Sequence, residues 1–310
     1  MTHSPPADGL KGVFAAALTP LKEDLSVDKE RMITHFHWLL ENGCDGLAVL
    51  GTTGEANSFS VAERIDILET INTADIPGSA LMPGTGCCSI PDTVALTSRA
   101  VELGAAGVLM LPPFYYKNVS DDGLFAAYSE VIERVGDARL RVYLYHFPQM
   151  SAVPLSYDLI ERLLKRYPGT IAGMKDSSGI FDNMAGAAEK FPGFNVFSGG
   201  DDFLLPLLQK GGAGCITAVC NIACNLSARI YKAWKQGDSS AEEMQQQLIT
   251  VRAAAQTYPY SAGLKAVLAH FSGDEDWRTV RPPLAQLDEK KTADLIGLLA
   301  ATGHTPPSLT

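Results

Sequence analysis

The run Ile-Ala-Gly-Met-Lys-Asp-Ser-Ser, residues 171–178, carries the pattern from which the fold can be inferred. A short apolar segment is followed by one lysine and then by polar residues. This pattern is expected for a strand that is buried on both faces of a sheet. A lysine at the end of such a strand reaches water, pairs with a neighbour such as Asp176, or acts as an amine nucleophile. Lys175 alone does not distinguish these roles, so the rest of the chain has to decide between them.

Short apolar runs of the same kind recur along the chain and predict eight buried strands. They are residues 13–18, 47–50, 80–82, 107–111, 141–146, 171–175, 195–198 and 214–218. Stretches with helical spacing lie between most of them. One apolar stripe comprises Met32, Ile33, Phe36, Leu39 and Leu40 and ends at Asn42-Gly43, and a second comprises Leu159, Leu163 and Leu164 and ends at Pro168-Gly169. Strands that alternate with helices predict a parallel sheet covered on its faces.

The predicted fold class is α/β, with eight strand–helix units that close into a (β/α)8 TIM barrel. A doubly wound sheet would place a glycine-rich turn after the first strand, where Leu18-Thr19-Pro20 stands instead. After about Asn225 the strand pattern is lost and helical spacing continues. We therefore predict a barrel catalytic domain at residues 1–225 and a C-terminal helical segment, packed on the barrel, at residues 226–310. The tail at residues 301–310 is expected to be loosely held.

Composition excludes several classes of function. The net charge of −10 argues against a nucleic-acid-binding protein and against attraction to an anionic membrane. Residues 1–10 lack the apolar core of a signal peptide, and no apolar run is long enough to cross a bilayer. We therefore expect a cytoplasmic protein. The six cysteines include no CxxC pair, so we interpret them as small buried thiols.

Polar residues follow several of the predicted strands, at the edge where a barrel of this kind carries its chemistry. The turn Gly51-Thr52-Thr53-Gly54-Glu55 offers backbone N–H groups and two hydroxyls, which suits a carboxylate ligand but also fits a plain turn before a helix. Tyr145 ends an apolar strand. A buried tyrosine commonly finds one hydrogen-bond partner, and beside an amine nucleophile it can also shuttle protons. His146 would point to the opposite face of that strand, so we interpret it as a hydrogen-bonded structural residue.

Three other pairs of residues are candidate metal ligands by residue type. Asp201 and Asp202 can bind a metal or sugar hydroxyls, or cap the helix that follows. His35 and His37 are two residues apart on a predicted helix and therefore do not share a face. Cys220 and Cys224 have no clustered second pair of ligands. The sequence therefore predicts no metal and no cofactor.

Taken together, the strand ends resemble the dihydrodipicolinate synthase and N-acetylneuraminate lyase family. The motifs are Gly-Thr-Thr-Gly-Glu at 51–55, a tyrosine before proline at 145–148, Gly-x-Lys-Asp at 173–176, Gly-Gly-x-Gly-x-Ile at 211–216 and Val-Arg-Pro-Pro-Leu at 280–284. The resemblance spans nearly the whole chain, from Gly12 to about Leu284. It implies a class I, Schiff-base lyase that acts on a 2-oxo acid and is built as a barrel with a C-terminal helical bundle. Such enzymes are commonly homotetramers.

The resemblance also implies roles for individual residues. Lys175 would form the imine with the 2-oxo carbon of pyruvate or of a pyruvate-derived acid. Tyr145 would be the acid and base for carbinolamine formation and C–C cleavage. Thr52 would link Tyr145 to a second tyrosine, best matched by Tyr115, which in the family reaches in from a neighbouring subunit.

Two further residues would contact the substrate. Thr53 would hold the substrate carboxylate, and the Ile216 carbonyl would face the reacting centre. The chemistry agrees with elementary principles, because an iminium is an electron sink that lets the adjacent carbon lose or gain a substituent without a metal.

Departures from the family pattern bear on the substrate. Met150 stands where dihydrodipicolinate synthases carry an arginine for the second substrate's carboxylate, and methionine cannot form the forked ion pair. Ser177, Asp201 and Asp202 fall where lyases place groups that meet substrate hydroxyls. Pro-Phe-Tyr-Tyr-Lys at 113–117 is similar to the neuraminate lyase loop, whereas Thr52 replaces that enzyme's usual serine.

The sequence therefore predicts an aldolase that reversibly cleaves a hydroxylated 2-oxo acid, of the 2-keto-3-deoxy sugar acid type, to pyruvate and an aldehyde. The alternatives are a dihydrodipicolinate synthase, which condenses pyruvate with aspartate semialdehyde, and a dehydratase or deaminase that uses the same imine. A non-enzymatic alternative is a barrel that binds an oxo acid as a sensor or has lost turnover.

Overall fold

The computed structural model describes residues 9–308. Its strands are short, and all of their residues are buried except the half-buried Ala172. They are β1 (Gly12–Ala15), β2 (Gly46–Leu47), β3 (Val108–Met110), β4 (Val142–His146), β5 (Ile171–Asp176), β6 (Asn195–Ser198) and β7 (Gly214–Thr217). Each lies inside or within one residue of a predicted run, because a buried strand in a parallel sheet has to be apolar on both faces.

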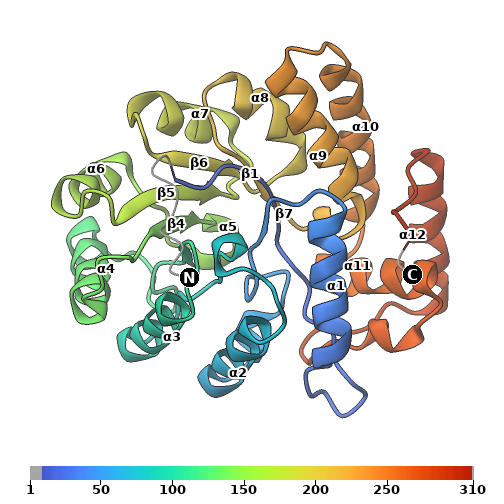
Figure 1. Cartoon of the computed structure of the whole chain (residues 1–310), viewed down its shortest axis with the longest axis horizontal. Helices are drawn as coiled ribbons and strands as arrows, with labels where there is room; N and C mark the ends of the chain where they lie inside the picture. The colour runs from blue at the N-terminus through green and yellow to red at the C-terminus, as the bar shows by residue number, and fades with distance from the viewer. Residues whose placement is uncertain (1–8, 309–310) are drawn as a thin grey trace. The chain divides into compact units, whose positions relative to one another are not determined.

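Helices follow most of the strands in the chain (Figure 1). The α-helices are α1 (Lys29–Glu41), α2 (Val61–Asn72), α3 (Ile90–Glu102), α4 (Asp121–Val135), α5 (Pro148–Ser151), α6 (Tyr157–Arg166), α7 (Phe181–Lys190), α8 (Leu204–Gln209), α9 (Cys220–Gln236), α10 (Ser240–Ala255), α11 (Tyr260–Ser272) and α12 (Glu289–Ala301). Short 3-10 turns are η1 (Ala56–Ser58), η2 (Gly78–Ala80), η3 (Asp201–Phe203) and η4 (Glu275–Arg278).

The chain divides into two compact units. Unit 1 comprises the described residues up to Lys11, Ser60–Gly200 and Pro206–Cys215. Unit 2 comprises Gly12–Phe59, Asp201–Leu205 and the described residues from Ile216 onward. The predicted division into residues 1–225 and 226–310 stays a prediction, and its boundary falls within α9.

In unit 1 the strands β3, β4, β5 and β6 lie side by side in that order and pair in parallel. Gly214 and Cys215, at the start of β7, continue the pairing next to β6. The helices α2, α3, α4, α6 and α7 follow one another along the outside of these strands (Figure 1). Leu159 and Leu163 on α6 are buried as predicted, and the helix stops before Pro168, which cannot continue it.

The predicted strand at 80–82 is the one difference in this unit. In place of a regular strand, Leu81 forms an isolated bridge and Gly84 forms a second one, in parallel with Leu109. The Leu109 N–H donates to the Pro83 carbonyl and the Thr85 N–H donates to the Leu109 carbonyl. Pro83 has no N–H of its own to donate, which limits how far a regular ladder can extend here.

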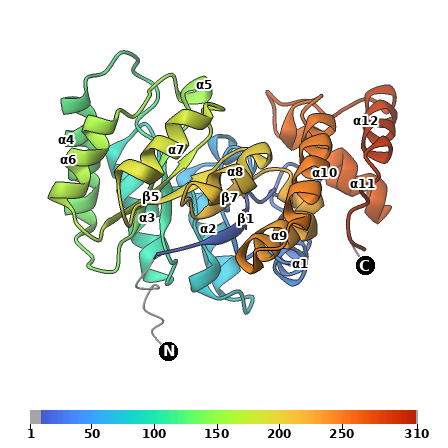
Figure 2. The same ribbon diagram turned by 90° about the horizontal axis from the view of Figure 1, so that it is seen from above.

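In unit 2, β1 and β2 pair in parallel, and the Ala16 N–H donates to the Thr217 carbonyl at the end of β7. Figure 2 shows α10, α11 and α12 gathered side by side, in agreement with their contacts. The stripe on α1 buries Met32, Phe36 and Leu39 as predicted, and it also buries His35 and Trp38.

The C-terminal tail is more tightly held than we expected. The Trp38 Nε1–H donates to the Ser308 carbonyl at 2.6 Å, and His304 Nε2 lies 2.9 Å from the Ile222 carbonyl. Residues 302–308 are therefore tied to the helices α1 and α9. Within residues 9–308, the structure contains no helix with the length and apolarity that a membrane crossing requires.

Candidate active site

Lys175 lies near the end of β5, directly opposite Tyr145 on the neighbouring strand β4. Side chains alternate across a strand, so residues paired in register on adjacent strands face the same side of the sheet. The Lys175 Nζ is 4.6 Å from the centroid of the Tyr145 ring. Both side chains are about 95% buried, and Phe147 stacks on the Tyr145 ring with 5.7 Å between ring centroids. The structure thus brings together the predicted nucleophile and the predicted proton donor.

The pairing of Lys175 with Asp176, which is the structural alternative, is absent. The Asp176 carboxylate accepts from the Ser178 N–H at 2.7 Å and from the Asn183 Nδ2 at 2.5 Å. Asp176 also follows Lys175 in the strand and so faces the other side. In the described part of the chain, no carboxylate lies within ion-pair distance of the Lys175 amine. The amine is therefore buried and has no ion-pair partner among residues 9–308.

His146 is paired in register with Asp176 and has the structural role that the sequence predicted. Its Nδ1 accepts a hydrogen bond from the Leu155 N–H at 3.1 Å, so the neutral imidazole carries its proton on Nε2. Burial lowers the pKa of His146, and the Asp176 carboxylate opposes that shift. The ring therefore fixes the segment at Leu155 against the strand end.

Ser177 follows directly after β5 and is half-buried. Its N–H donates to the His146 carbonyl, and Gly199 packs against it so closely that a Cβ at Gly199 would lie 2.0 Å from the Ser177 Oγ. Glycine at position 199 is therefore needed for the serine to keep this place.

Tyr115 and Met150, two other predicted site residues of unit 1, are exposed. Tyr115 is 73% exposed and packs edge-to-face against Tyr116, with 5.3 Å between ring centroids. The Lys117 Nζ donates to the Phe114 and Ser151 carbonyls and so braces this loop. Met150 on α5 is 60% exposed. Neither side chain has a described contact with Tyr145 or Lys175.

In unit 2, the turn at residues 51–55 is held from several directions. Leu50 and Glu55, at its two ends, both have positive φ angles, which side chains other than glycine seldom adopt. The Thr19 hydroxyl donates to the Gly54 carbonyl, and the Ser261 hydroxyl of α11 donates to the Thr53 carbonyl at 3.0 Å. Such a conformation persists only where the surroundings enforce it, and it is commonly found at functional sites.

Glu55 is the main anchor of this turn. Its carboxylate accepts from the Lys265 Nζ at 2.5 Å and from the Arg281 N–H at 3.0 Å. The side chains of Glu55 and Lys265 are completely buried. Burial lowers the pKa of Lys265, and the Glu55 carboxylate opposes that shift. Sequence reasoning missed Lys265 and Ser261. The signal that could have found Lys265 is a single lysine inside the apolar run of α11.

The other predicted residues of unit 2 differ in exposure. Thr52 is half-buried, and its carbonyl accepts from the Glu55 N–H. Thr53 is buried, and Ile216 is completely buried within β7. Asp202 is half-buried and pairs with the Arg252 Nε at 3.2 Å. The side chain of Arg252 is 22% exposed.

Asp201 is completely buried and already engaged. Its carboxylate accepts from the Thr217 hydroxyl at 2.6 Å and lies 3.4 Å from the Arg252 Nη1. Burial and Cys220 raise the pKa of Asp201 to about 7, against the opposing effects of Arg252 and Thr217. These contacts favour a structural role for Asp201 and leave Asp202 as the more accessible of the two carboxylates.

We expect Asp201 to make stability depend on pH. Its pKa rises from 3.8 to about 7 on folding, so the folded protein keeps a proton that the unfolded chain has lost in this interval. This contribution to the free energy of unfolding is present below about pH 4 and is lost as the pH rises to about 7. The loss has a slope of up to about 1.4 kcal/mol per pH unit, the value for one proton.

Urea denaturation at a series of pH values tests this on the wild type and on Asp201→Asn. The variant should gain stability relative to the wild type as the pH rises through this interval. The exposed control Asp158→Asn should run parallel to the wild type. A constant difference between Asp201→Asn and the wild type would contradict the raised pKa.

The comparisons with known proteins agree with this geometry. Residues 9–302 match the Dihydrodipicolinate synthetase family. A relative from Chloroflexus aurantiacus, described as an uncharacterized DapA-like lyase, is 34% identical over 92% of this chain and 94% of its own length. The crystal structure of dihydrodipicolinate synthase from Agrobacterium tumefaciens matches with a TM-score of 0.87 and 31% identity over 94% of this chain and 99% of that chain.

A second solved structure carries a ligand. YagE from E. coli K12, a prophage protein of the dihydrodipicolinic acid synthase family, was solved in complex with pyruvate. It matches with a TM-score of 0.87 and 28% identity over 94% of this chain and 98% of that chain.

The fold class is thus α/β, as predicted, with seven regular parallel strands among the described residues where the predicted (β/α)8 barrel has eight, and the protein is an enzyme of the lyase class, also as predicted. The chain belongs to the Dihydrodipicolinate synthetase family.

Proposed function

We propose that this protein is a Schiff-base aldolase that cleaves a hydroxylated 2-oxo acid to pyruvate and an aldehyde, and forms it in the reverse direction. The observation that carries the proposal is the buried Lys175 amine, which faces the Tyr145 ring at 4.6 Å and has no carboxylate partner among the described residues. An amine placed in this way is available to a carbonyl carbon, whereas an ion-paired one is not. Membership of a lyase family supports the same reading.

The cleavage reaction follows from this arrangement. The Lys175 Nζ attacks the 2-oxo carbon, and the carbinolamine loses water to give an iminium. Tyr145 takes the proton of the C4 hydroxyl while the C3–C4 bond breaks, so that the aldehyde leaves and its bonding electrons pass to the iminium as an enamine. C3 then takes up a proton, and water hydrolyses the imine to release pyruvate and the free amine. Tyr145 carries the proton that leaves the C4 hydroxyl, and the reaction requires no oxidant or reductant.

In the same proposal, Thr53 holds the substrate carboxylate, the Ile216 carbonyl faces the reacting centre, and Thr52 connects Tyr145 to Tyr115. The strained and anchored turn at 51–55 supports a carboxylate site, because a rigid set of backbone N–H groups binds an anion without further ordering. The 73% exposure of Tyr115 in a single chain supports a homotetramer in which this residue serves a neighbouring subunit.

The substrate class is proposed from three further predicted site residues. Ser177 and Asp202 are partly exposed polar groups, which suits contact with the hydroxyls of a 2-keto-3-deoxy sugar acid. Met150 offers no charge to a second carboxylate. A screen of 2-keto-3-deoxy acids and of aldehydes, with pyruvate release or consumption as the readout, tests the proposal. Turnover of aspartate semialdehyde alone among the aldehydes would refute it in favour of the synthase.

The synthase remains the second candidate, because the Agrobacterium tumefaciens enzyme is 31% identical. The substitution Met150→Arg separates the two. Met150 is 60% exposed on a short helix, so the longer side chain needs no repacking. An arginine forms two parallel bonds with a carboxylate, and we expect kcat/KM with aspartate semialdehyde to rise about tenfold.

Steady-state kinetics with pyruvate and aspartate semialdehyde measure this effect. Met150→Lys is the matched control, because it adds the same charge without the forked geometry and should gain less. Equal rates for the wild type and both variants would show that position 150 does not meet the second substrate.

A further inference from the structure

A cavity of about 370 Å³ lies in unit 2, and none of the residues assigned to catalysis is among those that line it. It is formed by α1, by the end of α11 and by η4. The side chains that determine its chemistry are Glu30, Arg31, His35, Trp38, Asp274 and Trp277. This volume accommodates a small organic molecule.

The walls of the cavity are aromatic. The Trp38 ring stacks on the His35 ring, with 5.7 Å between centroids and 15° between planes. Trp277 meets the same imidazole edge-on at 5.1 Å. Aromatic rings in such a setting attract cations, because the ring faces carry negative potential.

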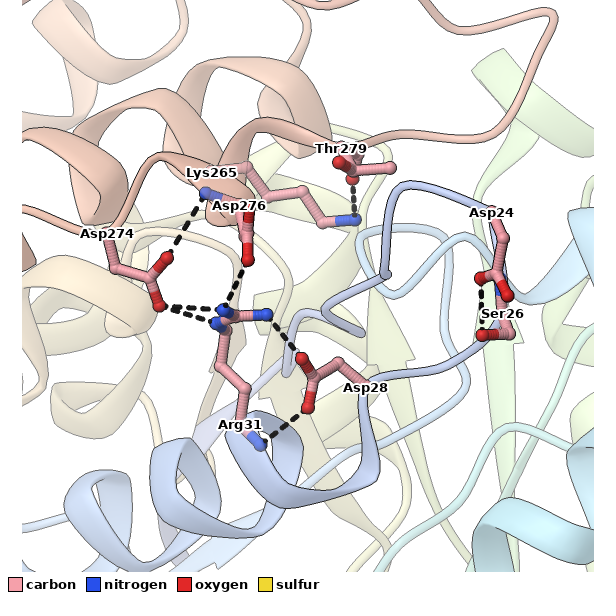
Figure 3. A network of polar contacts seen from close by, with 8 residues as sticks. All are labelled: Asp24, Ser26, Asp28, Arg31, Lys265, Asp274, Asp276 and Thr279. Atoms are coloured by element: carbon pink, nitrogen blue, oxygen red, sulfur yellow. Dashed lines mark hydrogen bonds and ion pairs between the residues drawn. The ribbon is translucent and has the colours of Figure 1, made fainter.

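The rim of the cavity carries an excess of negative charge. Three carboxylates, Asp28, Glu30 and Asp274, line it together with a single cation, Arg31. The guanidinium of Arg31 is already engaged, as Figure 3 shows. It donates to Asp28 and lies 2.8 Å from Asp274, and Asp276 approaches it at 3.3 Å from outside the lining. Glu30 is therefore left without a cation among the residues that line the cavity.

His35 supplies a buried hydrogen-bond acceptor without a partner. The Asn221 Nδ2 donates to the carbonyls of Ala16 and Ala218, which fixes its Oδ1 as the atom 2.9 Å from His35 Nε2. Nε2 must then carry the proton, and Nδ1 keeps a lone pair. Burial lowers the pKa of His35 to about 4, so the ring stays neutral near neutral pH. Nδ1 is buried and has no hydrogen-bond partner among the described residues.

These features together point to one class of ligand. A positively charged ligand would be attracted by the carboxylates and by the indole faces, and an N–H group of that ligand could donate to the lone pair of His35 Nδ1. Among the described residues, no group of three His, Cys, Asp or Glu side chains could hold a metal ion. We propose that this cavity is a binding site for a small organic cation of the primary alkylammonium class.

Tryptophan fluorescence tests the proposal, because two of the three tryptophans of the chain line the cavity. The experiment uses full-length Trp234→Phe protein, in which only Trp38 and Trp277 report. Titration with putrescine should change the emission in a saturable way, and butane-1,4-diol, of the same shape but uncharged, should not. Putrescine should also raise the melting temperature, since a ligand that binds only the folded state stabilises it.

Two variants in the same background locate the site. Glu30→Gln should weaken putrescine binding about threefold or more, because it removes the unpaired carboxylate of the rim. Glu243→Gln changes a carboxylate that lines a different cavity of unit 2 and should leave binding unchanged. The proposal would be overturned by an emission change that does not saturate with putrescine, or by an equal change with the diol. It would also be overturned if Glu30→Gln and Glu243→Gln bound putrescine equally well. None of these outcomes depends on the reaction at Lys175.

Discussion

Lys175→Ala is expected to lower turnover by about four orders of magnitude or more, because it removes the atom that forms the covalent bond with the substrate. The fold should persist, since the Lys175 amine makes no ion pair among the described residues and the substitution leaves no partner charge buried. Aldolase activity and a urea denaturation curve measure the two effects. Lys165→Ala is the matched control, because Lys165 lies on the exposed face of α6 in the same unit.

Reduction with borohydride in the presence of pyruvate supplies an independent test. The wild type and Lys165→Ala should each gain one covalent adduct, and peptide mapping should place it on Lys175. Lys175→Ala should gain none. Wild-type activity without an adduct would rule out the imine mechanism, and activity retained by Lys175→Ala would rule out this lysine as the nucleophile.

Lys265→Met is expected to lower the free energy of unfolding by about 3–5 kcal/mol, the usual cost of leaving one member of a buried ion pair without its partner. The buried Glu55 carboxylate would then keep the Arg281 N–H as its one donor within the described part of the chain. Urea denaturation measures the loss. In the double variant Lys265→Met/Glu55→Gln the uncompensated charge is gone, so we expect a substantial part of the stability to return.

The pair Lys165–Glu161 is a suitable control for this cycle. Its N–O distance of 2.5 Å equals that of Lys265–Glu55, but its side chains are 74% and 40% exposed. An exposed pair of this kind contributes little, because water screens the two charges. Equal losses from Lys165→Met and Lys265→Met would show that burial does not determine the contribution of the pair.

The sequence predicts some of this structure because local pattern and strand geometry carry enough information. The apolar runs mark the strands, and the period of two places His146 on the face opposite Tyr145. That Lys175 shares the face of Tyr145 follows from the register of β4 with β5, which the structure supplies. The same reasoning predicts a strand at 80–82, where the structure has isolated bridges at Leu81 and Gly84 with Pro83 between them. Local pattern does not specify where proline interrupts a ladder.

Contacts between distant segments could not be predicted in this way. Glu55 and Lys265 are 210 residues apart, and the residues of the turn at 51–55 do not indicate which distant side chain pairs with Glu55. Asp201 fits a helix cap or a substrate contact in the sequence, whereas its actual partners are Thr217 and Arg252. In the sequence His35 is a candidate metal ligand and nothing more, because Trp277, whose indole meets its ring, lies far away in the chain.

The dependence of the turn at 51–55 on α11 has a consequence for the order of events during synthesis. A ribosome makes this turn early, but Lys265 and Arg281, which hold Glu55, emerge more than two hundred residues later. Until then the Glu55 carboxylate remains hydrated, and no contact with Lys265 or Arg281 stabilises the unfavourable backbone angles of the turn. The nascent protein therefore acquires this part of its site only when its last helices have been translated, and a chain that stops before α11 would lack it.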